Sequence, residues 1–523
     1  DRRHRAGLGL PQRARPQAVS RRVLAACLAL ALLAGCSAAP ASTPAAADAQ
    51  PTAAPTAAPA ASGVLTIGRS TAGYNPYLSD NTLVEQDAGL LFERFVQITP
   101  DLDLDYRLAD AIDSAGNQVV IHLRGGCYFA DGDAITPDDA AASLWAAKSS
   151  PMYGARLANL ENITVDGSSL TLTLSQPDSL FGYLCDLPVL KAEEVASTQP
   201  TASGRYTYGA DGTLVKNSRA PFPSNGPDVI HTTEVNSYDE MVSGLSVGSL
   251  NLYAASDSAS GSTGYYGQES YYKTNNLIFL GVNSGGDSPL VTTGAGRAMV
   301  SQLVDRRQLA ESSYLGRAYP AVGAINSFYP CVNSQQVLLA NQNTDGVAEF
   351  FAQQGYTMDV QSGYWADGTG KRASLRLLVY TGSTYKKYAA SLIQQQLGSQ
   401  GIEVQILETD DFDAYRQQIT DGQFDLYIGE IKLYNNMDLS PFFSGGAASA
   451  HLAQSETLST AYGAFRANKS AAGDFEAVFA AEMPYIPLLW RSNTVVAARG
   501  ISGLTSSLSD VFYSLDGLRF GNS

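Results

Sequence analysis

The sequence is poor in the residues that most often hold metals. Its 523 residues include five cysteines and four histidines, the histidines are scattered, and Cys127, Cys185 and Cys331 lack the spacing of a zinc site. Neither a zincin motif nor a Walker A loop occurs. We therefore expect no multi-histidine metal centre, no cofactor, and at most one disulfide among these three cysteines, whose commoner role is that of small buried hydrophobic residues.

Basic residues are in the minority. The first 35 residues hold seven Arg and one Asp, so removing them from the totals of 34 basic and 50 acidic residues leaves 27 and 49, a net charge of −22. A field of this sign repels phosphate backbones, which argues against nucleic acid as a partner, and it mildly favours cationic or zwitterionic ligands. Many exported proteins are acidic simply because the charge keeps them soluble. We favour this explanation of the acidic composition over a role in choosing the ligand.

Long apolar runs are also scarce. After residue 36 no run of 18 apolar residues occurs, so we expect no transmembrane helix there. The one apolar run near the N-terminus, residues 23–34, follows Arg21 and Arg22 and is too short to span a bilayer comfortably, which is typical of a signal peptide. It ends in Leu-Leu-Ala-Gly-Cys at residues 32–36, which resembles the lipobox of bacterial lipoproteins. The resemblance implies a signal peptide at residues 1–35 and a lipid anchor on Cys36.

The next segment has too little apolar surface to fold. Residues 36–63 are almost entirely Ala, Pro, Thr and Ser, which predicts a disordered linker between the anchor and the folded part. The remaining chain, about 460 residues from Val64, is too long for one core and suits two or three subdomains.

Strand and helix signals alternate along this folded part. Residues 119–124 form a β-rich run, residues 163–165 and 170–174 flank an Asp-Gly turn, and Thr136 with Pro137 is typical of a capped helix start. Residues 375–428 predict β-α-β-α-β with short connections, and hence a parallel sheet covered by helices. Ligands of such sheets bind beyond the carboxyl ends of the strands, which indicates the expected loop at residues 429–440.

One long motif stands out. Residues 121–139 read Ile-His-Leu-Arg-Gly-Gly-Cys-Tyr-Phe-Ala-Asp-Gly-Asp-Ala-Ile-Thr-Pro-Asp-Asp. This resembles the signature of the family 5 substrate-binding proteins of ABC importers, the oligopeptide, dipeptide and nickel group. Shorter motifs occur in the family order, including Gly-Arg-Tyr at 204–206, where the family has Gly-Pro-Tyr. The others are at residues 74–77, 90–95, 107–111, 280–283, 296–306, 422–426 and 483–488.

The resemblance implies an α/β fold, a two-lobed periplasmic-binding-protein clamp of the class II-like type with an extra subdomain in lobe I. Lobe I would span residues 64–280 and 487–523, and lobe II residues 281–486. The implied function is capture of a short peptide or peptide-like solute for an ABC permease, outside the cytoplasm at the bacterial cell membrane, in the periplasmic space or at the cell surface. We expect a monomer that performs no catalysis.

The resemblance also suggests ligand-binding residues. Asp80 aligns near an acid that meets basic ligand side chains, and Tyr153 near a pocket tyrosine. The aspartate that pairs with a peptide's amino group in the family falls here on Tyr434 or Asn435, so it is displaced or absent. Glu430 or Asp438 is a substitute anion, although Asp438 also suits a turn. The candidate set is Asp80, Tyr153, Glu430, Lys432, Tyr434, Asn435 and Asp438.

Other functions remain open. The ligand is alternatively a nickel chelate or another small molecule, and the protein is alternatively a sensor without a transporter. A less favoured alternative is an exported serine hydrolase, because residues 244–248 read Gly-Leu-Ser-Val-Gly and His451 comes later, in triad order. That motif should follow a strand and open a helix, whereas residues 238–245 already read as a helix.

Overall fold

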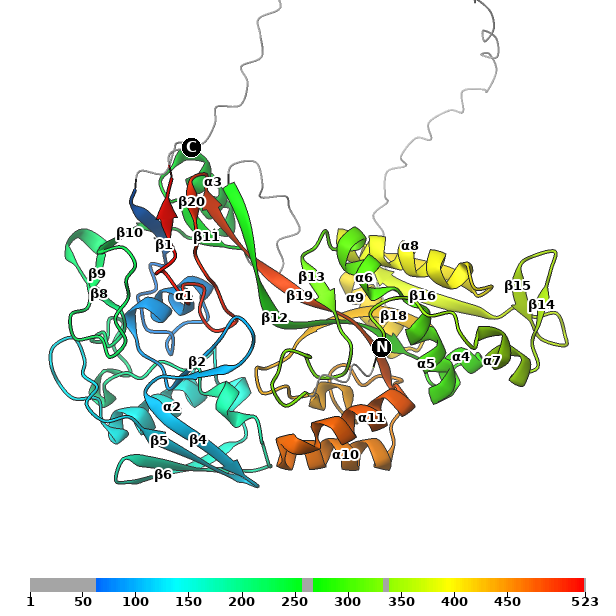
Figure 1. The fold of residues 1–523 in the computed structure, drawn as a ribbon, viewed down its shortest axis with the longest axis horizontal. Helices are drawn as coiled ribbons and strands as arrows, with labels where there is room; N and C mark the ends of the chain where they lie inside the picture. The colour runs from blue at the N-terminus through cyan, green and yellow to red at the C-terminus, as the bar shows by residue number, and fades with distance from the viewer. Residues whose placement is uncertain (1–62, 256–266, 333–337, 522–523) are drawn as a thin grey trace, which may run out of the picture. The chain divides into compact units, whose positions relative to one another are not determined.

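The computed structural model describes residues 63–255, 267–332 and 338–521, which form a mixed α/β fold (Figure 1). The predicted signal peptide, Cys36 and all of the linker except Gly63 lie outside these residues. Eleven strands form the main sheet. In spatial order they are β17 (Glu403–Thr409), β16 (Ser374–Tyr380), β18 (Leu426–Lys432), β12 (Gly267–Val282), β19 (Tyr485–Ala498), β11 (Leu252–Ala254), β1 (Leu65–Arg69), β10 (Val229–Glu234), β9 (Leu214–Lys216) and β8 (Tyr206–Tyr208), with β13 (Ala318–Pro320) paired to β19.

Smaller sheets and helices surround the main sheet. The smaller sheets are β4 (Ala109–Ala115), β5 (Gln118–Leu123), β7 (Ser169–Leu174) and β6 (Leu160–Asp166); β2 (Val96–Ile98) with β3 (Leu104–Tyr106); β14 (Thr357–Asp359) with β15 (Tyr364–Ala366); and β20 (Ile501–Ser502) with β21 (Arg519–Phe520). The α-helices are α1 (Thr82–Leu91), α2 (Pro137–Ser149), α3 (Tyr238–Val247), α4 (Pro289–Thr292), α5 (Gly294–Leu303), α6 (Arg306–Gln308), α7 (Val347–Gln353), α8 (Thr384–Gly398), α9 (Phe412–Thr420), α10 (Glu456–Ala467) and α11 (Ala472–Glu482).

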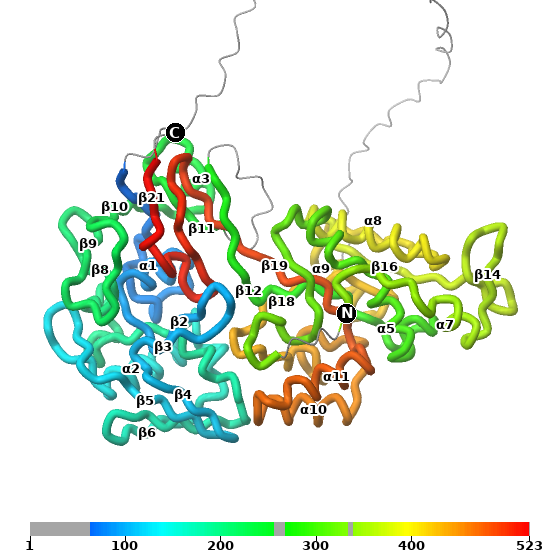
Figure 2. Tube along the Cα trace, in the orientation of Figure 1, coloured from blue at the N-terminus to red at the C-terminus, as the bar shows by residue number. Residues whose placement is uncertain are grey.

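Two hydrophobic clusters form the core. The N-terminal cluster contains buried residues between Leu65 and Ala254 and, from the end of the chain, Val495 to Leu518. The C-terminal cluster contains buried residues between Leu277 and Trp490, joined by four from the N-terminal half: Ile98, Leu102, Leu180 and Tyr183. Strands β12 and β19 are paired antiparallel and run from one cluster to the other, as Figure 2 shows. The chain therefore crosses between the clusters on two hydrogen-bonded strands.

Several predicted elements are confirmed. Helix α2 begins after Thr136, whose side chain accepts the Asp139 amide hydrogen at 3.2 Å while the Asp139 carboxylate accepts the Thr136 amide hydrogen at 2.8 Å. This reciprocal capping box, with Pro137 in the first turn, satisfies donors that a helix start leaves free. The hairpin predicted around Asp166-Gly167 is the β6–β7 pair.

The predicted β-α-β-α-β unit is also confirmed, with one difference. Strand β16 pairs parallel with β17 and β18, and α8 and α9 connect them. However, β18 continues to Lys432, so the expected loop after the strand starts at Leu433 and not at Gly429. The reason is that β12 supplies partners for this stretch, with Asn276 opposite Lys432 and Phe279 opposite Gly429.

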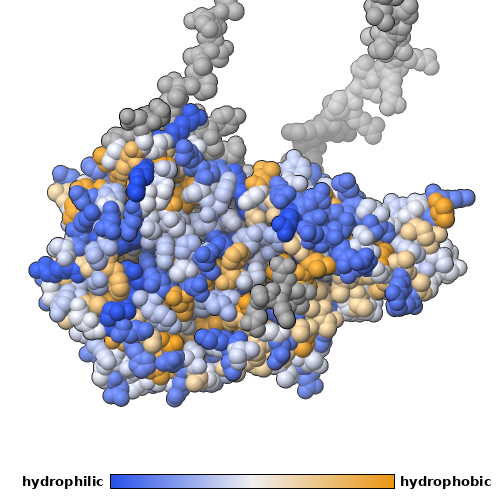
Figure 3. Space-filling model, in the orientation of Figure 1, coloured by the Kyte–Doolittle hydropathy of each residue, from blue (hydrophilic) through white to orange (hydrophobic). Residues whose placement is uncertain are grey.

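Polar residues dominate the visible surface. On the face drawn in Figure 3, hydrophilic residues predominate and apolar residues are scattered among them. Among the described residues, no helix has the length and apolar character needed to cross a membrane.

Asp87 is an unusual buried acid in α1. It is 1% exposed, and its Oδ2 atom has no hydrogen-bond partner among the described residues. Burial raises its pKa well above the ordinary range, although nearby Arg69 opposes the shift. A raised carboxyl pKa means that stability falls as pH rises through the range above the unfolded pKa.

We therefore expect Asp87→Asn to increase the free energy of unfolding relative to the wild type, and to do so more at pH 8 than at pH 4. Urea unfolding at the two pH values measures this difference. An equal effect at both pH values would show that Asp87 is not held protonated by the fold.

Candidate functional site: a cavity beside the crossing strands

A cavity of about 570 Å³ lies beside β12 and β19. Its walls come from five parts of the chain: the start of α1, the start of α3, the two crossing strands with the end of β11, the end of β18, and a segment near the C-terminus. The lining residues are Asp80, Asn81, Thr82, Leu83, Glu85, Gln86, Val235, Asn236, Ser237, Tyr238, Met241, Ala254, Ala255, Tyr272, Thr274, Lys432, Asn493, Leu508, Ser509, Asp510 and Val511.

Two helix starts contribute to these walls. The Asn81 side chain caps α1 by accepting the Leu83 amide hydrogen at 2.9 Å, and the Ser237 side chain caps α3 by accepting that of Glu240 at 3.2 Å. These caps fix where each helix begins. They thereby place Asp80 and Glu85 on one wall.

The cavity contains charges of both signs. The carboxylates of Asp80 and Glu85 form no hydrogen bond or ion pair with the residues that the structure describes. Lys432, the last residue of β18, also lines the cavity. The cavity lining therefore includes acidic and basic side chains.

The crossing strands are irregular where they meet the cavity. The register of β12 against β19 shifts between Lys273 and Asn276. Thr274 lies within this bulge, and its hydroxyl donates to the Arg491 carbonyl at 2.6 Å. Bulges locally increase twist and re-aim side chains, and here they bring Thr274 to the cavity wall.

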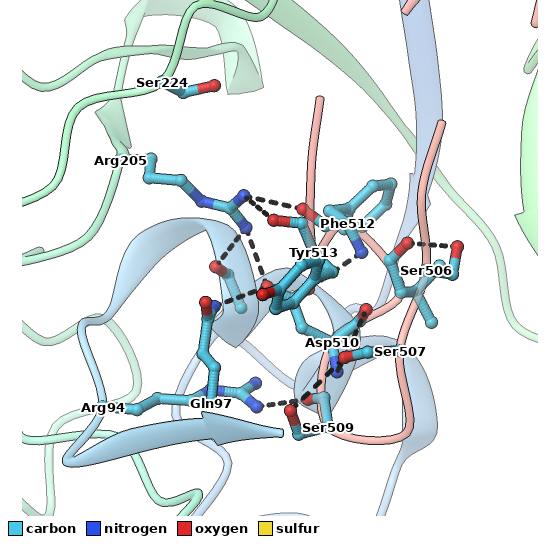
Figure 4. A network of polar contacts seen from close by, with 12 residues as sticks. Arg94, Gln97, Arg205, Ser224, Ser506, Ser507, Ser509, Asp510, Phe512 and Tyr513 are labelled. Carbon is cyan, nitrogen blue, oxygen red and sulfur yellow. Dashed lines mark hydrogen bonds and ion pairs between the residues drawn. The ribbon is translucent and has the colours of Figure 1, made fainter. Parts of the chain in front are cut away.

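The C-terminal segment forms a further wall. Ser509 and Asp510 are held by polar side chains from the N-terminal half of the chain, namely Arg94, Gln97 and Arg205, as Figure 4 shows. Within the same segment, Val511 belongs to the N-terminal cluster, while Leu508 packs against the C-terminal cluster. This wall therefore contacts both halves of the fold.

The structure brings two of the predicted site residues, Asp80 and Lys432, into the cavity. Glu430 lies on β18 outside the cavity lining, with ion pairs to Lys386 at 2.9 Å and Arg491 at 3.0 Å. Burial alone would raise the pKa of Glu430, but the two cations outweigh it and hold that pKa below its ordinary value. Its charge is thus already compensated within the protein.

The other four predicted residues also lie outside the cavity lining. Tyr153 is 2% exposed and packs within the N-terminal cluster beside Tyr77. Tyr434 is 41% exposed on the surface. The Asp438 carboxylate accepts the Ser440 amide hydrogen and the Tyr462 hydroxyl, each at 2.9 Å, which is the alternative turn role predicted for this residue.

Asn435 and its neighbour Asn436 connect the two halves of the fold. The Asn435 side chain donates to Asp186 at 3.1 Å, and its carbonyl accepts the Tyr329 hydroxyl at 2.6 Å. The Asn436 side chain donates to Asp178 at 2.6 Å. The loop that the family resemblance suggested for ligand contact therefore holds the N-terminal half through two buried aspartates.

The hydrolase motif lacks its required context. Gly244 to Val247 form the last turn of α3, which ends at Gly248 in the left-handed conformation, and the Ser246 hydroxyl donates to the Ser243 carbonyl. His451 instead contacts the Thr420 carbonyl, in the C-terminal half. The motif does not form the strand-to-helix turn that a nucleophile elbow needs.

Cysteines and metal ligands are dispersed. Cys127, Cys185 and Cys331 form no disulfide within the part of the chain that the structure describes. Within the described ranges, no group of three or more His, Cys, Asp or Glu side chains is arranged to hold a metal ion.

Comparison with known proteins identifies the family. The profile of the bacterial extracellular solute-binding proteins, family 5 (middle region), matches residues 98–450. The chain belongs to this family. No curated protein sequence matches significantly. Family 5 proteins serve ABC importers as substrate-binding subunits and act outside the cytoplasm, so those coarser predictions are confirmed.

Solved family 5 structures share the fold at low identity. The murein tripeptide-binding protein MppA, in its unliganded open form, is 16% identical with a TM-score of 0.69, covering 90% of this chain and 99% of its own. A nickel ABC transporter protein from Bacillus halodurans is 16% identical with a TM-score of 0.68, covering 87% and 99%. The oligopeptide-binding protein AppA from Bacillus subtilis, bound to a nonapeptide, is 15% identical with a TM-score of 0.52, covering 88% and 99%.

Sequence reasoning missed most of the cavity wall. The segment from Leu508 to Val511 lies more than 300 residues from the N-terminal groups that hold it, with separations of 305 residues for Arg205 and Asp510 and 415 residues for Arg94 and Ser509. No local pattern reports such a pairing. The available signal was Glu85, an acid in the first turn of a helix that follows Asp80.

Proposed function

We propose that this family 5 protein captures a short peptide or peptide-like solute in the cavity and delivers it to an ABC permease. The observation that carries the proposal is the mixed charge of the cavity, with Asp80 and Glu85 on one wall and Lys432 on another. A peptide has an ammonium at one end and a carboxylate at the other. Closure of the two halves about β12 and β19 would then enclose the ligand, which is the usual motion of such clamps.

We further propose that the protein works as a monomer tethered to the cell membrane through a lipid on Cys36. Support comes from the lipobox-like sequence at residues 32–36 and the Ala/Pro/Thr linker after it. Mass spectrometry of the protein extracted from its native membrane tests this proposal. Detection of a diacylated N-terminal Cys36 is expected, and an unmodified Cys36 within an intact leader would refute it.

A thermal-shift screen of the full chain tests the ligand class. A ligand that binds only the folded state raises the melting temperature, with about 2.7 kcal/mol of added stability at a concentration of 100 times Kd. We expect tripeptides and tetrapeptides to raise it, and free sugars to leave it unchanged. A shift with a nickel–histidine chelate but with no peptide would replace the peptide by a metal chelate as the ligand.

Variants of the charged wall residues then test the site. We expect Asp80→Asn and Lys432→Met each to weaken binding of the best peptide by about tenfold, corresponding to about 1.4 kcal/mol. Glu311→Gln is the control, because Glu311 is an exposed acid outside the cavity. Isothermal titration calorimetry measures the affinities, and equal affinities for all three variants would rule out this cavity as the site.

A further inference from the structure

Arg205 joins two walls of the cavity. One guanidinium nitrogen, Nη2, donates to the Gly89 carbonyl of α1 at 2.9 Å and to the Asp510 carboxylate at 2.9 Å. The other, Nη1, donates to the carbonyls of Phe512 at 2.7 Å and Tyr513 at 3.2 Å. One buried side chain thus binds α1 and the C-terminal segment at the same time (Figure 4).

Asp510 is the matching acceptor. Asp510 is one of the residues that line the cavity, and its side chain is fully buried. Both of its carboxylate oxygens accept hydrogen bonds from other residues of the protein. Oδ2 accepts from Arg205 and from Gln97 at 3.0 Å, and Oδ1 accepts the Phe512 amide hydrogen at 2.8 Å. Both oxygens of the carboxylate therefore have partners within the protein, and these hydrogen bonds hold the wall together.

The adjacent residue is fixed in the same way. The Ser509 hydroxyl accepts the Ile98 amide hydrogen at 2.9 Å, and the Ser509 carbonyl accepts a hydrogen bond from Arg94. Both polar residues of the wall are thus bound to the N-terminal half, while Leu508 beside them packs against the C-terminal cluster.

The fit between α1 and Asp510 leaves no spare room. A Cβ atom added at Gly89 would lie 2.6 Å from Asp510 Oδ1, closer than such atoms approach in real structures. Glycine here allows the helix backbone to approach the carboxylate. Any displacement of the C-terminal segment would therefore change its distance from α1, which carries Glu85 and Gln86 on the facing wall.

We propose that Arg205 and Asp510 are positioning residues for ligand binding, which hold the Leu508–Val511 wall at a fixed distance from α1. This inference rests on the proposed function of the cavity. A buried ion pair adds little net stability compared with a hydrophobic pair, and its best-attested use is to fix one arrangement among several. Arg205 also occupies the middle of the Gly-Arg-Tyr motif, where the family pattern has proline, which has no side-chain donor.

The test compares four variants of the full chain. Arg205→Met removes the donors, Arg205→Lys retains the positive charge, and Gly89→Ala adds a methyl group against Asp510 without changing any charge. Arg376→Met is the control, because Arg376 forms an ion pair with Asp425 at 3.1 Å away from the cavity lining. The readouts are amide hydrogen exchange of residues 82–91 and 506–513 and the affinity for trialanine.

We expect Arg205→Met to speed exchange in both segments and to weaken trialanine binding by about tenfold or more, since each 1.4 kcal/mol is a factor of ten. Arg205→Lys should recover most of the affinity. Gly89→Ala should also weaken binding, although alanine ordinarily favours a helix over glycine. Arg376→Met should match the wild type in both readouts.

Unchanged exchange at residues 506–513 in Arg205→Met would overturn the positioning role. A wild-type chain that does not bind trialanine would count against peptide capture. In that case the exchange comparison would still decide whether Arg205 holds the Leu508–Val511 wall against α1, because faster exchange confined to residues 82–91 and 506–513 upholds this role and unchanged exchange there refutes it.

Discussion

Replacing Arg466 by Met should reduce the free energy of unfolding by about 3 kcal/mol at pH 8, the low end of the cost of breaking a buried ion pair. Arg466, on α10, lies 2.7 Å from the Asp178 carboxylate, and their side chains are 12% and 2% exposed. Arg466 also donates to the Asn436 carbonyl at 2.7 Å. Without Arg466, the buried Asp178 carboxylate keeps only neutral donors, the Asn436 side chain at 2.6 Å and the Leu180 amide at 3.1 Å.

The loss of unfolding free energy in Arg466→Met should be smaller at pH 5 than at pH 8. Burial raises the pKa of Asp178, although Arg466 and Asn436 act in the opposite direction. Removing Arg466 raises that pKa further, so the variant loses stability as pH rises through this range, and a proton relieves the charge at lower pH.

Urea unfolding of Arg466→Met at pH 5 and pH 8 measures both effects. The control is Arg372→Met, because Arg372 and Glu403 form a pair in which both side chains are more than 40% exposed. Such pairs contribute roughly 0–1 kcal/mol. The expectation fails if the two arginine variants lose the same stability.

Glu476 should also make the free energy of unfolding depend on pH, independently of Asp178. This residue of α11 is 2% exposed, and its two carboxylate oxygens accept the amide hydrogens of Ala324 at 2.9 Å and Ile325 at 2.7 Å. Burial raises its pKa from 4.5 to about 7, although both hydrogen bonds oppose the shift.

The direction of the effect depends on the two pKa values. Below pH 4.5 the carboxyl is protonated in both the folded and the unfolded chain. Between pH 4.5 and about 7 the unfolded chain loses the proton first, so the free energy of unfolding falls by up to about 3 kcal/mol, and above pH 7 it levels off.

Glu476→Gln removes this titration and should flatten the pH dependence over that interval. Urea unfolding at pH 4.5 and pH 8 measures it, with Glu456→Gln as the control, because Glu456 is an exposed acid in the first turn of α10. A Glu476→Gln variant with the pH dependence of the wild type would show that the carboxyl titrates normally in the folded protein.

Local patterns predicted local structure well. The capped start of α2 and the β16–α8–β17–α9–β18 unit rest on short-range signals: caps, periodicity and turn residues. The end of β18 differs from the predicted end because the hydrogen-bond partners of its last residues lie on β12, about 150 residues earlier in the chain, as Asn276 opposite Lys432 shows. A sequence pattern does not report which distant strand will supply such partners.

The site was predicted only in part, for the same reason. Asp80 and Lys432 lie in the cavity, and Glu430 is paired with two cations that come from α8 and β19. Glu430, which is only two positions from Lys432 on the same strand, therefore has different neighbours. The wall from Leu508 to Val511 depends on Arg205 and Gln97, which no short-range rule connects to it.

The composition of the N-terminal cluster has a consequence for the order of folding. That cluster requires Val495 to Leu518, and β1 adjoins β11, which in turn pairs with the end of β19. Contacts across such sequence separations form slowly, because the intervening chain must first be brought together. A chain that emerges N-terminus first therefore holds its first half unfinished until its last residues arrive, whereas β16 to β18 assemble from neighbouring segments. Completion of the N-terminal cluster therefore has to wait for residues 495–518, although its other members are made first.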